Sequence, residues 1–137
     1  MTRDPHAAPP RIAVLADDLI WATRLADGVR RAGGTPVPAR SAAALDAALP
    51  GVDGCVIDLT ARAYDPLACL GAAAAAGVPA IAAGQHDDSE TRRAALAAGA
   101  SRVFAYRTLF EHGDRELGAW LGRLADRAVT LDTEESA

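Results

Sequence analysis

Five short runs of apolar residues recur along the chain, and each predicts a β-strand. The runs cover residues 12–16, 35–39, 54–59, 78–83 and 102–106. Continuous apolar runs of this length are typical of strands that are buried on both faces of a sheet. The second run contains Pro36 and Pro38. Because proline has no N–H to donate to a neighbouring strand, we expect this strand at an edge of the sheet.

Between these runs, apolar residues recur at helical spacing. Trp21, Leu25 and Val29 lie four residues apart and predict a helix. Ser41 and Ser89 are favourable N-caps for two further helices. The predicted helices cover residues 19–32, 41–49, 65–76 or 66–76, and 89–98. A last helix is expected to begin near residue 114, with an apolar stripe formed by Leu117, Trp120, Leu121, Leu124 and Ala128.

The alternation of strands and helices predicts an α/β fold. Short strands joined by helices form a parallel sheet covered on both faces, and right-handed crossovers give a doubly wound arrangement. At 137 residues the chain suits one domain. We expect this domain at residues 11–128, between a flexible leader at residues 1–10 and a disordered acidic tail at residues 129–137.

Three carboxylates follow two of the predicted strands. Asp17 and Asp18 come directly after the first strand, and Asp58 closes the third. If the strand order is 2-1-3-4-5, these strands are neighbours, and their carboxyl ends meet where doubly wound folds bind ligands. Three close carboxylates repel one another unless a cation or protons intervene, and hard oxygen ligands suit Mg²⁺. The pattern therefore predicts a Mg²⁺ site beside a carboxylate that can take part in phosphoryl transfer.

Each of these carboxylates also has a simpler structural explanation. Asp18 is well placed to cap the helix that follows it. Asp17 would then be a solvated loop residue and Asp58 a polar strand end. The coincidence of a pair after one strand and a single carboxylate after its neighbour favours the functional interpretation.

Composition argues against several classes of function. The net charge is −4, which disfavours general binding to nucleic acid or to a membrane surface. All 14 basic residues are arginine, so a P-loop lysine is missing, and no G-x-G-x-x-G follows the first strand. No apolar run could span a bilayer and residues 1–10 lack a signal-peptide core, so we expect a cytoplasmic protein. Cys55 and Cys69 are expected to be small buried hydrophobes.

Four segments carry a resemblance to a known family. They are IAVLADD, GVDGCVIDL, VPAIAAGQHDD and ALAAGASRVF. Over about residues 11–127 the sequence resembles the receiver domain of two-component response regulators, a flavodoxin-like α/β fold. The resemblance implies a doubly wound five-stranded parallel sheet of order 2-1-3-4-5. It also implies that Asp17 and Asp18 hold Mg²⁺ beside Asp58, and that Asp58 accepts phosphate from a histidine kinase or phosphotransfer protein.

The sequence departs from the family pattern at two positions. Receivers end the fourth strand with Ser or Thr, whose hydroxyl contacts the phosphoryl group, and here Gly84 stands in that place. Receivers also place a lysine at the end of the fifth strand. This chain has none, and Tyr106 or Arg107 takes the position, depending on the register. We therefore expect an atypical receiver that is phosphorylated on Asp58 and has an altered switch.

Other interpretations remain open. In a pseudo-receiver the fold would serve as a protein-interaction module without phosphorylation. The resemblance places the interaction surface on the fourth helix, fifth strand and last helix, where Arg92, Arg93, Arg102 and Arg107 form either a basic patch or solvated helix charges. His86 is expected to be a solvated loop residue. An independent enzyme ranks last. Residues 129–137 are too few for a DNA-binding output module, so we expect output through a protein partner or phosphate relay, with homodimerisation left open.

Overall fold

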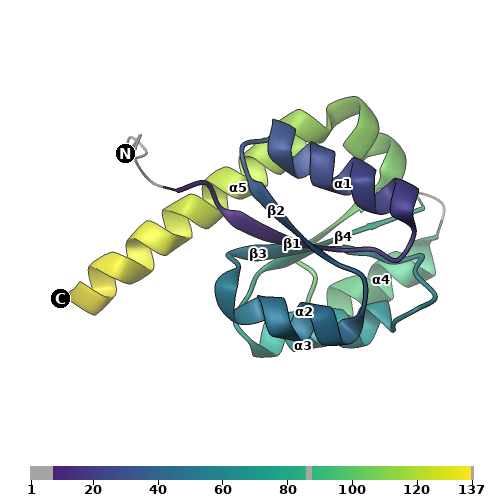
Figure 1. The fold of residues 1–137 in the computed structure, drawn as a ribbon, viewed down its shortest axis with the longest axis horizontal. Coiled ribbons are helices and arrows are strands. Elements are labelled where there is room, and N and C mark those ends of the chain that lie inside the picture. The colour runs from purple at the N-terminus through teal and green to yellow at the C-terminus, as the bar shows by residue number, and fades with distance from the viewer. Residues whose placement is uncertain (1–7, 86–87, 137) are drawn as a thin grey trace.

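A five-stranded parallel sheet forms the centre of the computed structural model, which describes residues 8–85 and 88–136 (Figure 1). The strand order is β2-β1-β3-β4-β5, so the predicted doubly wound α/β fold is confirmed. The edge strand β2 carries Pro36 and Pro38, as expected. The strands are β1 (Arg11–Leu15), β2 (Thr35–Ala39), β3 (Gly54–Asp58), β4 (Ala80–Gly84) and β5 (Arg102–Ala105).

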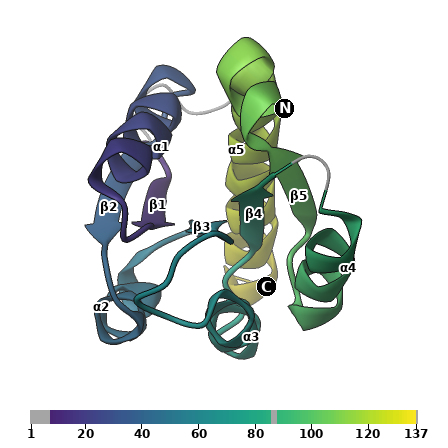
Figure 2. The same ribbon diagram turned by 90° about the vertical axis from the view of Figure 1, so that its right-hand side faces the viewer.

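Helices cover both faces of this sheet. One face carries α1 (Leu19–Arg31) and α5 (Tyr106–Ser136), and the other carries α2 (Ala42–Ala48), α3 (Pro66–Ala75) and α4 (Ser89–Ala98), with a 3₁₀ turn η1 (Leu49–Gly51) after α2 (Figure 2). Successive residues of β1 point to opposite faces. Ile12 and Val14 pack in the core under α1 and α5. Ala13 and Leu15 belong to the second core, under α2, α3 and α4.

Side-chain caps begin several helices. The Ser41 hydroxyl accepts a hydrogen bond from the N–H of Ala44 at 3.1 Å, as its position predicted. Asp65 caps α3, whose first residue is proline. The cap of α4 is Asp88 rather than the predicted Ser89, because the Asp88 carboxylate reaches the N–H of Thr91 at 3.0 Å.

The predicted stripe of the last helix packs on the sheet. Leu117, Trp120, Leu121 and Leu124 are all buried. Trp120 lies so close to β3 that only glycine fits opposite it: a Cβ on Gly54 would lie 2.9 Å from Cη2 of Trp120 and 2.8 Å from Cδ1 of Leu124. Gly54 therefore sets how closely α5 approaches the sheet.

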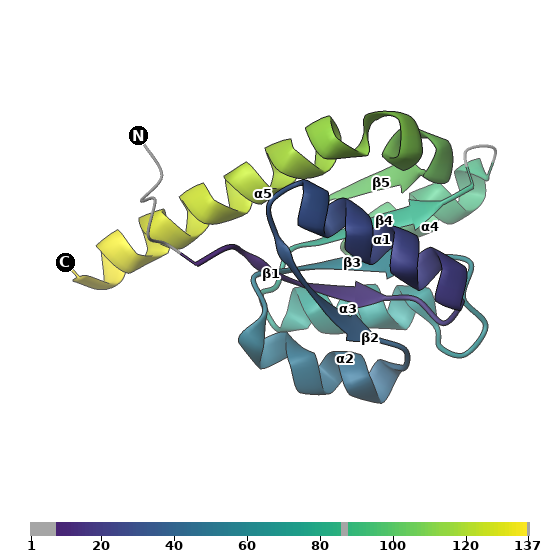
Figure 3. The same cartoon turned by 45° about the horizontal axis from the view of Figure 1, so that its top comes forward.

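The last helix differs from its prediction at both ends. It begins at Tyr106, directly after β5, and not near Asp114. Non-helical backbone angles at His112 (φ −134°, ψ 16°) separate its first turns from the rest, and the sequence pattern indicated only the longer part. The backbone of residues 129–136, expected to be disordered, continues the helix to Ser136 (Figure 3). Residues 123–136 contain no glycine or proline to end it.

Residues 1–7 of the predicted leader lie outside the described residues, as does residue 137 of the predicted tail. Residues 8–10 have no regular structure. Pro10 is buried, and its carbonyl accepts a hydrogen bond from the N–H of Thr35 at 2.8 Å.

Candidate functional site

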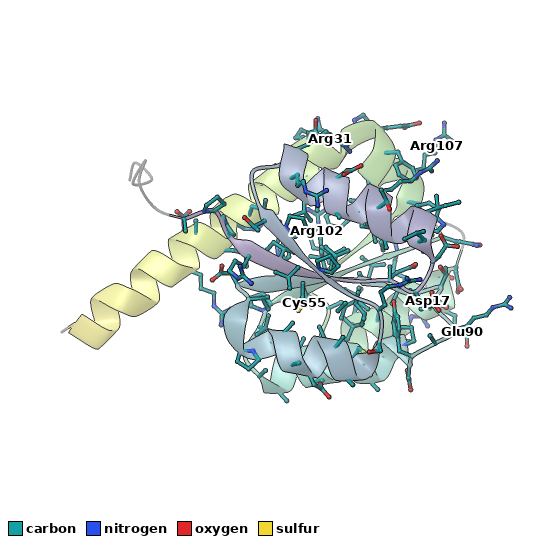
Figure 4. The ribbon with its side chains drawn as sticks, viewed as in Figure 1. Asp17, Arg31, Cys55, Glu90, Arg102 and Arg107 are labelled. Atoms are coloured by element: carbon teal, nitrogen blue, oxygen red, sulfur yellow. The ribbon has the colours of Figure 1, made fainter. Side chains whose placement is uncertain are left out.

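The predicted site residues lie at the carboxyl edge of the sheet. Asp17 follows β1, Asp58 is the last residue of β3, and Gly84 is the last residue of β4. Figure 4 shows Asp17 and Arg107 at the end of the molecule toward which the strands point. Asp58 is fully buried and is the one buried charged side chain in the part of the chain that the structure describes.

The two oxygens of the Asp58 carboxylate have different surroundings. Oδ1 accepts hydrogen bonds from the N–H of Thr60 at 3.0 Å and from its hydroxyl at 2.9 Å. It also accepts one from the hydroxyl of Tyr106. Oδ2 is buried and has no hydrogen-bond partner among the described residues. Since a buried unpaired oxygen is costly, Oδ2 is the atom at which a cation, a proton or a reacting group would be stabilised.

Oδ1 of Asp58 and the two hydroxyl oxygens that contact it form a closed triangle. The hydroxyls of Thr60 and Tyr106 lie 2.8 Å apart, in addition to their contacts with Asp58. The three oxygens of this triangle make three contacts, and the hydroxyls of Thr60 and Tyr106 supply only two protons for them. Burial and the hydrogen bond to Asp58 raise the pKa of the Tyr106 phenol above its usual value, so Tyr106 is a neutral donor at physiological pH.

Two residues of this site were not predicted. Thr60 places a hydroxyl beside Asp58, which Gly84 cannot do. The buried Tyr64 hydroxyl lies 2.9 Å from the carbonyl oxygens of both Leu15 and Asp58, and so links the ends of β1 and β3. Both lie in the segment after β3, where no periodic pattern marks them.

The paired aspartates accept hydrogen bonds from two different segments of the chain. Oδ2 of Asp17 accepts hydrogen bonds from the N–H groups of Ala63 and Arg62, each at 2.8 Å, and these bonds lower the pKa of the Asp17 carboxyl. Asp17 therefore holds the segment after β3, whereas a solvated loop residue would have no such role. Asp18 is the N-cap of α1, with Oδ1 accepting from the N–H of Trp21 at 3.0 Å.

Whether these residues fit Mg²⁺ depends on the carboxylate oxygens that they offer as ligands. Within residues 8–85 and 88–136, no three His, Cys, Asp or Glu side chains are grouped so that they could hold a metal ion. Asp17, Asp18 and Asp58 are therefore not preassembled as a three-carboxylate site. Mg²⁺ keeps several waters and needs only one or two carboxylates. The unpartnered Oδ2 of Asp58 is a hard oxygen that fits this requirement.

Of the two residues considered for the position of the missing lysine, the one that reaches Asp58 is Tyr106. Its hydroxyl contacts Asp58, whereas the side chain of Arg107 is 81% exposed and pairs with Glu111 at 3.0 Å. Gly84, at the end of β4, stands where the family pattern has Ser or Thr. It lies against Leu59, and a Cβ on Gly84 would be 3.3 Å from Cδ1 of that leucine. Gly84 also lines a groove of about 250 Å³ with Leu59, Thr60, Gln85, Asp88, Thr91, Arg92 and Val103. His86, predicted near this crevice, lies outside the described residues.

An aromatic stack covers the outer side of Tyr106. Its ring lies 3.8 Å from that of Trp21, centroid to centroid, with 29° between the planes. Trp21 also stacks on Phe110 at 5.2 Å. The guanidinium of Arg24 lies 5.0 Å from the Phe110 ring centroid and 5.7 Å from that of Trp21. Trp21 was predicted as part of the apolar stripe of α1, but it is only partly buried and contacts the site.

The four arginines of the predicted interaction surface do not form one uniform patch. Arg102 pairs with Glu116 at 3.3 Å, and Arg107 pairs with Glu111. Arg92 and Arg93 lie exposed on α4. Pairing with acidic neighbours favours the solvated-charge interpretation for Arg102 and Arg107.

Comparison with known proteins gives a clear answer at the level of the fold. No protein-family model and no curated protein matches the sequence, whereas 305 solved chains match the structure. A receiver-domain protein from Clostridium thermocellum is similar with a TM-score of 0.73 at 15% identity, over 89% of this chain and 98% of that one. The chain has the fold of response-regulator receiver domains.

Two further receiver-fold structures extend the comparison. The receiver domain of the sensor histidine kinase PA1611 from Pseudomonas aeruginosa has a TM-score of 0.71 at 19% identity, over 84% of this chain and 99% of that one, and it contains magnesium in its active-site cleft. NtrX from Brucella abortus, in complex with ADP, has a TM-score of 0.75 at 21% identity, over 93% of this chain and 29% of that one. The receiver fold here thus matches both a separate domain and part of a longer regulator.

Two remaining predictions concern the membrane and the cysteines. No helix in the described ranges has the length and apolarity needed to cross a bilayer. Cys55 and Cys69 are free and buried, which confirms that they serve as small core residues.

Proposed function

We propose that this protein is a phosphorelay receiver in which Asp58 accepts a phosphoryl group. The observation that carries the proposal is the buried carboxylate at the end of β3, with one oxygen held by Thr60 and Tyr106 and the other without a partner. An oxygen that is positioned but not hydrogen-bonded is suited to act as a nucleophile. In this fold the carboxyl edge of the sheet is also where ligands bind.

The proposed reaction is transfer to a carboxylate. Oδ2 of Asp58 attacks the phosphorus of a phosphohistidine on a kinase or phosphotransfer protein. A new P–O bond forms, and the bond between phosphorus and the donor nitrogen breaks with its electron pair going to the nitrogen. The product is an acyl phosphate on Asp58. The hydrogen bonds to Oδ1 hold the carboxylate in place while Oδ2 reacts.

Mg²⁺ is the proposed cofactor. Asp58 would hold it together with the carboxylates of Asp17 and Asp18, which accept the hydrogen bonds described above at Oδ2 and Oδ1, respectively. When bound, the ion neutralises charge on the phosphoryl group. The magnesium in the cleft of the PA1611 receiver domain supports this assignment.

The switch in this proposal differs from the one that the family resemblance implies. Gly84 has no hydroxyl to draw toward a phosphoryl group, and the hydroxyls that contact the carboxylate of Asp58 belong to Thr60 and Tyr106. Tyr106 brings a hydrogen-bond donor without the positive charge of lysine. We therefore assign the response to phosphorylation to Thr60 and Tyr106.

The test is intact mass spectrometry after incubation with acetyl phosphate and Mg²⁺. We expect a gain of one phosphoryl group in the wild type and in Asp65→Asn. That control changes an aspartate that caps α3, where asparagine caps equally well. Asp58→Asn and samples without Mg²⁺ should show no gain. Incubation with a phosphorylated histidine phosphotransfer protein should be included, because it supplies the donor chemistry that the proposal names.

A second candidate is a pseudo-receiver that binds a protein partner without phosphorylation. The observation in its favour is that Tyr106 and Thr60 already occupy Oδ1 of Asp58 in a chain without lysine. Its interaction surface would be the face formed by α4, β5 and α5. No phosphoryl gain from either donor, in a folded protein, would favour this candidate. Retained partner binding by Asp58→Asn would then establish it.

A further inference from the structure

Tyr106 belongs to two groups of contacts at once. Its hydroxyl bonds to Asp58 and Thr60 inside the site. Its ring stacks on Trp21, which in turn stacks on Phe110. Phe110 is 46% exposed, so this series of contacts leads from a fully buried carboxylate to the protein surface between α1 and α5.

Trp21 is fixed to the site at two points. Its backbone N–H donates to the carboxylate of Asp18 at 3.0 Å. Its ring is stacked on that of Tyr106, with 3.8 Å between the two ring centroids. A movement of the Tyr106 ring therefore requires Trp21 to follow or the stack to break.

On the side of α4, the described residues, which do not include residues 86 and 87, make no comparable connection. Gly84 has no side chain to bind a group on Asp58, and the groove beside it separates Thr60 from Thr91 and Arg92 of α4. The continuous contacts from Asp58 run toward α1 and α5, not toward α4.

We infer that Trp21 is a positioning residue that holds Tyr106 against Asp58, and that the state of Asp58 is transmitted through Tyr106 to Trp21 at the α1–α5 edge. The part that concerns phosphorylation rests on the proposed function. The coupling between Asp58 and Trp21 does not rest on the proposed function, because replacing the Asp58 carboxylate also changes the group that the Tyr106 hydroxyl contacts.

The first test uses tryptophan fluorescence of the full chain. The chain has two tryptophans, Trp21 and the buried Trp120, so the difference between each protein and its Trp21→Phe counterpart reports Trp21 alone. We expect Asp58→Asn to shift the Trp21 emission maximum. In a Tyr106→Phe background, where the hydroxyl is missing, Asp58→Asn should cause no further shift. An equal shift in both backgrounds, or no shift in either, would overturn the inference.

The second test uses the rate of phosphorylation by acetyl phosphate. Trp21→Ala removes the support of Tyr106 and should change the rate severalfold, whereas Trp21→Phe keeps an aromatic stack and should restore most of the wild-type rate. Circular dichroism and thermal unfolding establish that both variants fold. If both variants change the rate equally, or neither does, the positioning role is wrong.

The two proposals fail in different ways. If Asp58 takes no phosphate but the fluorescence coupling depends on Tyr106, the proposed function fails and the connection to Trp21 stands. If Asp58 is phosphorylated and Trp21 does not respond in the wild type, the proposed function stands and the inference fails.

Discussion

The hydroxyl of Tyr106 donates a hydrogen bond to Oδ1 of Asp58, a residue 48 positions earlier in the chain. This contact joins the start of α5 to the end of β3. It also places a neutral phenol where the family resemblance implies an ammonium group. Tyr106 would therefore supply no positive charge to compensate a phosphoryl group at Asp58.

Replacing Thr60 should reveal how much the hydroxyl triangle contributes to stability. Thr60→Val keeps the shape of the side chain but removes its bonds to Asp58 and Tyr106. We expect the free energy of unfolding to fall by about 1 kcal/mol, measured by urea denaturation. Thr60→Ser retains the hydroxyl and is the matched control. Equal stability of the valine and serine variants would contradict this prediction.

A methyl group at Gly54 should disturb the contact between β3 and α5. The added Cβ of Gly54→Ala would lie 2.8 Å from Cδ1 of Leu124, and overpacking of this kind costs about 1–3 kcal/mol. Gly51→Ala is the control, because a Cβ at that position meets nothing within 4 Å. Thermal unfolding should separate the two variants clearly. Similar melting temperatures would show that α5 moves away without cost.

Removing the Tyr64 hydroxyl should weaken the connection between β1 and β3. In Tyr64→Phe the carbonyls of Leu15 and Asp58 lose a buried donor, at an expected cost of about 1–3 kcal/mol. Urea denaturation measures this cost. Burial and the nearby Asp58 raise the pKa of the Tyr64 phenol, so the loss should be constant between neutral and mildly alkaline pH. A loss that varies over that range would contradict the assignment.

The cap of α4 should make a pH-dependent contribution to stability. Hydrogen bonds from the Thr91 hydroxyl and N–H lower the pKa of the Asp88 carboxyl below its ordinary value of 3.8. A lowered folded-state pKa stabilises the protein above pH 3.8, and this stability is lost as the pH falls through the folded-state value. Carboxyl titration by NMR should show the Asp88 pKa rising in Thr91→Ala. An unchanged Asp88 pKa in that variant would show that the Thr91 hydroxyl does not stabilise the ionised carboxylate.

The core cysteine of β3 should resist thiol reagents. Burial raises the pKa of the Cys55 thiol to about 12, and the thiolate is the reactive form. We expect an alkylating reagent at mildly alkaline pH to label Cys55 only on the unfolding timescale. Protein unfolded in urea, where both cysteines are exposed, provides the control. Rapid labelling of the native protein would contradict the packing described here.

The strand-end aspartates could be predicted from the sequence because their signal is local. An apolar run followed by a carboxylate identifies Asp17 and Asp58 without knowledge of the tertiary structure. The helix-cap explanation also applies to Asp18, since it depends only on the residues that follow. The order of elements was predictable for the same reason.

The contacts of Tyr106 with Asp58 and Trp21 could not be predicted because they join distant segments. The apolar run at residues 102–106 did not show that β5 ends at Ala105, and a shift of one residue decides whether Tyr106 or Arg107 reaches the site. Helical spacing placed Trp21 in the apolar stripe, but it cannot show that the ring stacks on an aromatic residue of α5. Thr60 follows a strand with no periodic pattern of its own.

The strand β5 leads into the helix α5 without a loop, so the two elements are directly connected. No residue separates Ala105 from Tyr106, so no loop can absorb a displacement of Tyr106. The nearest departure from helical geometry is at His112. Just beyond it, Asp114 is anchored to α1 by Arg31 at 3.3 Å. A displacement of Tyr106 would therefore be passed directly to the first turns of α5, which include the buried Leu109, as far as the break at His112.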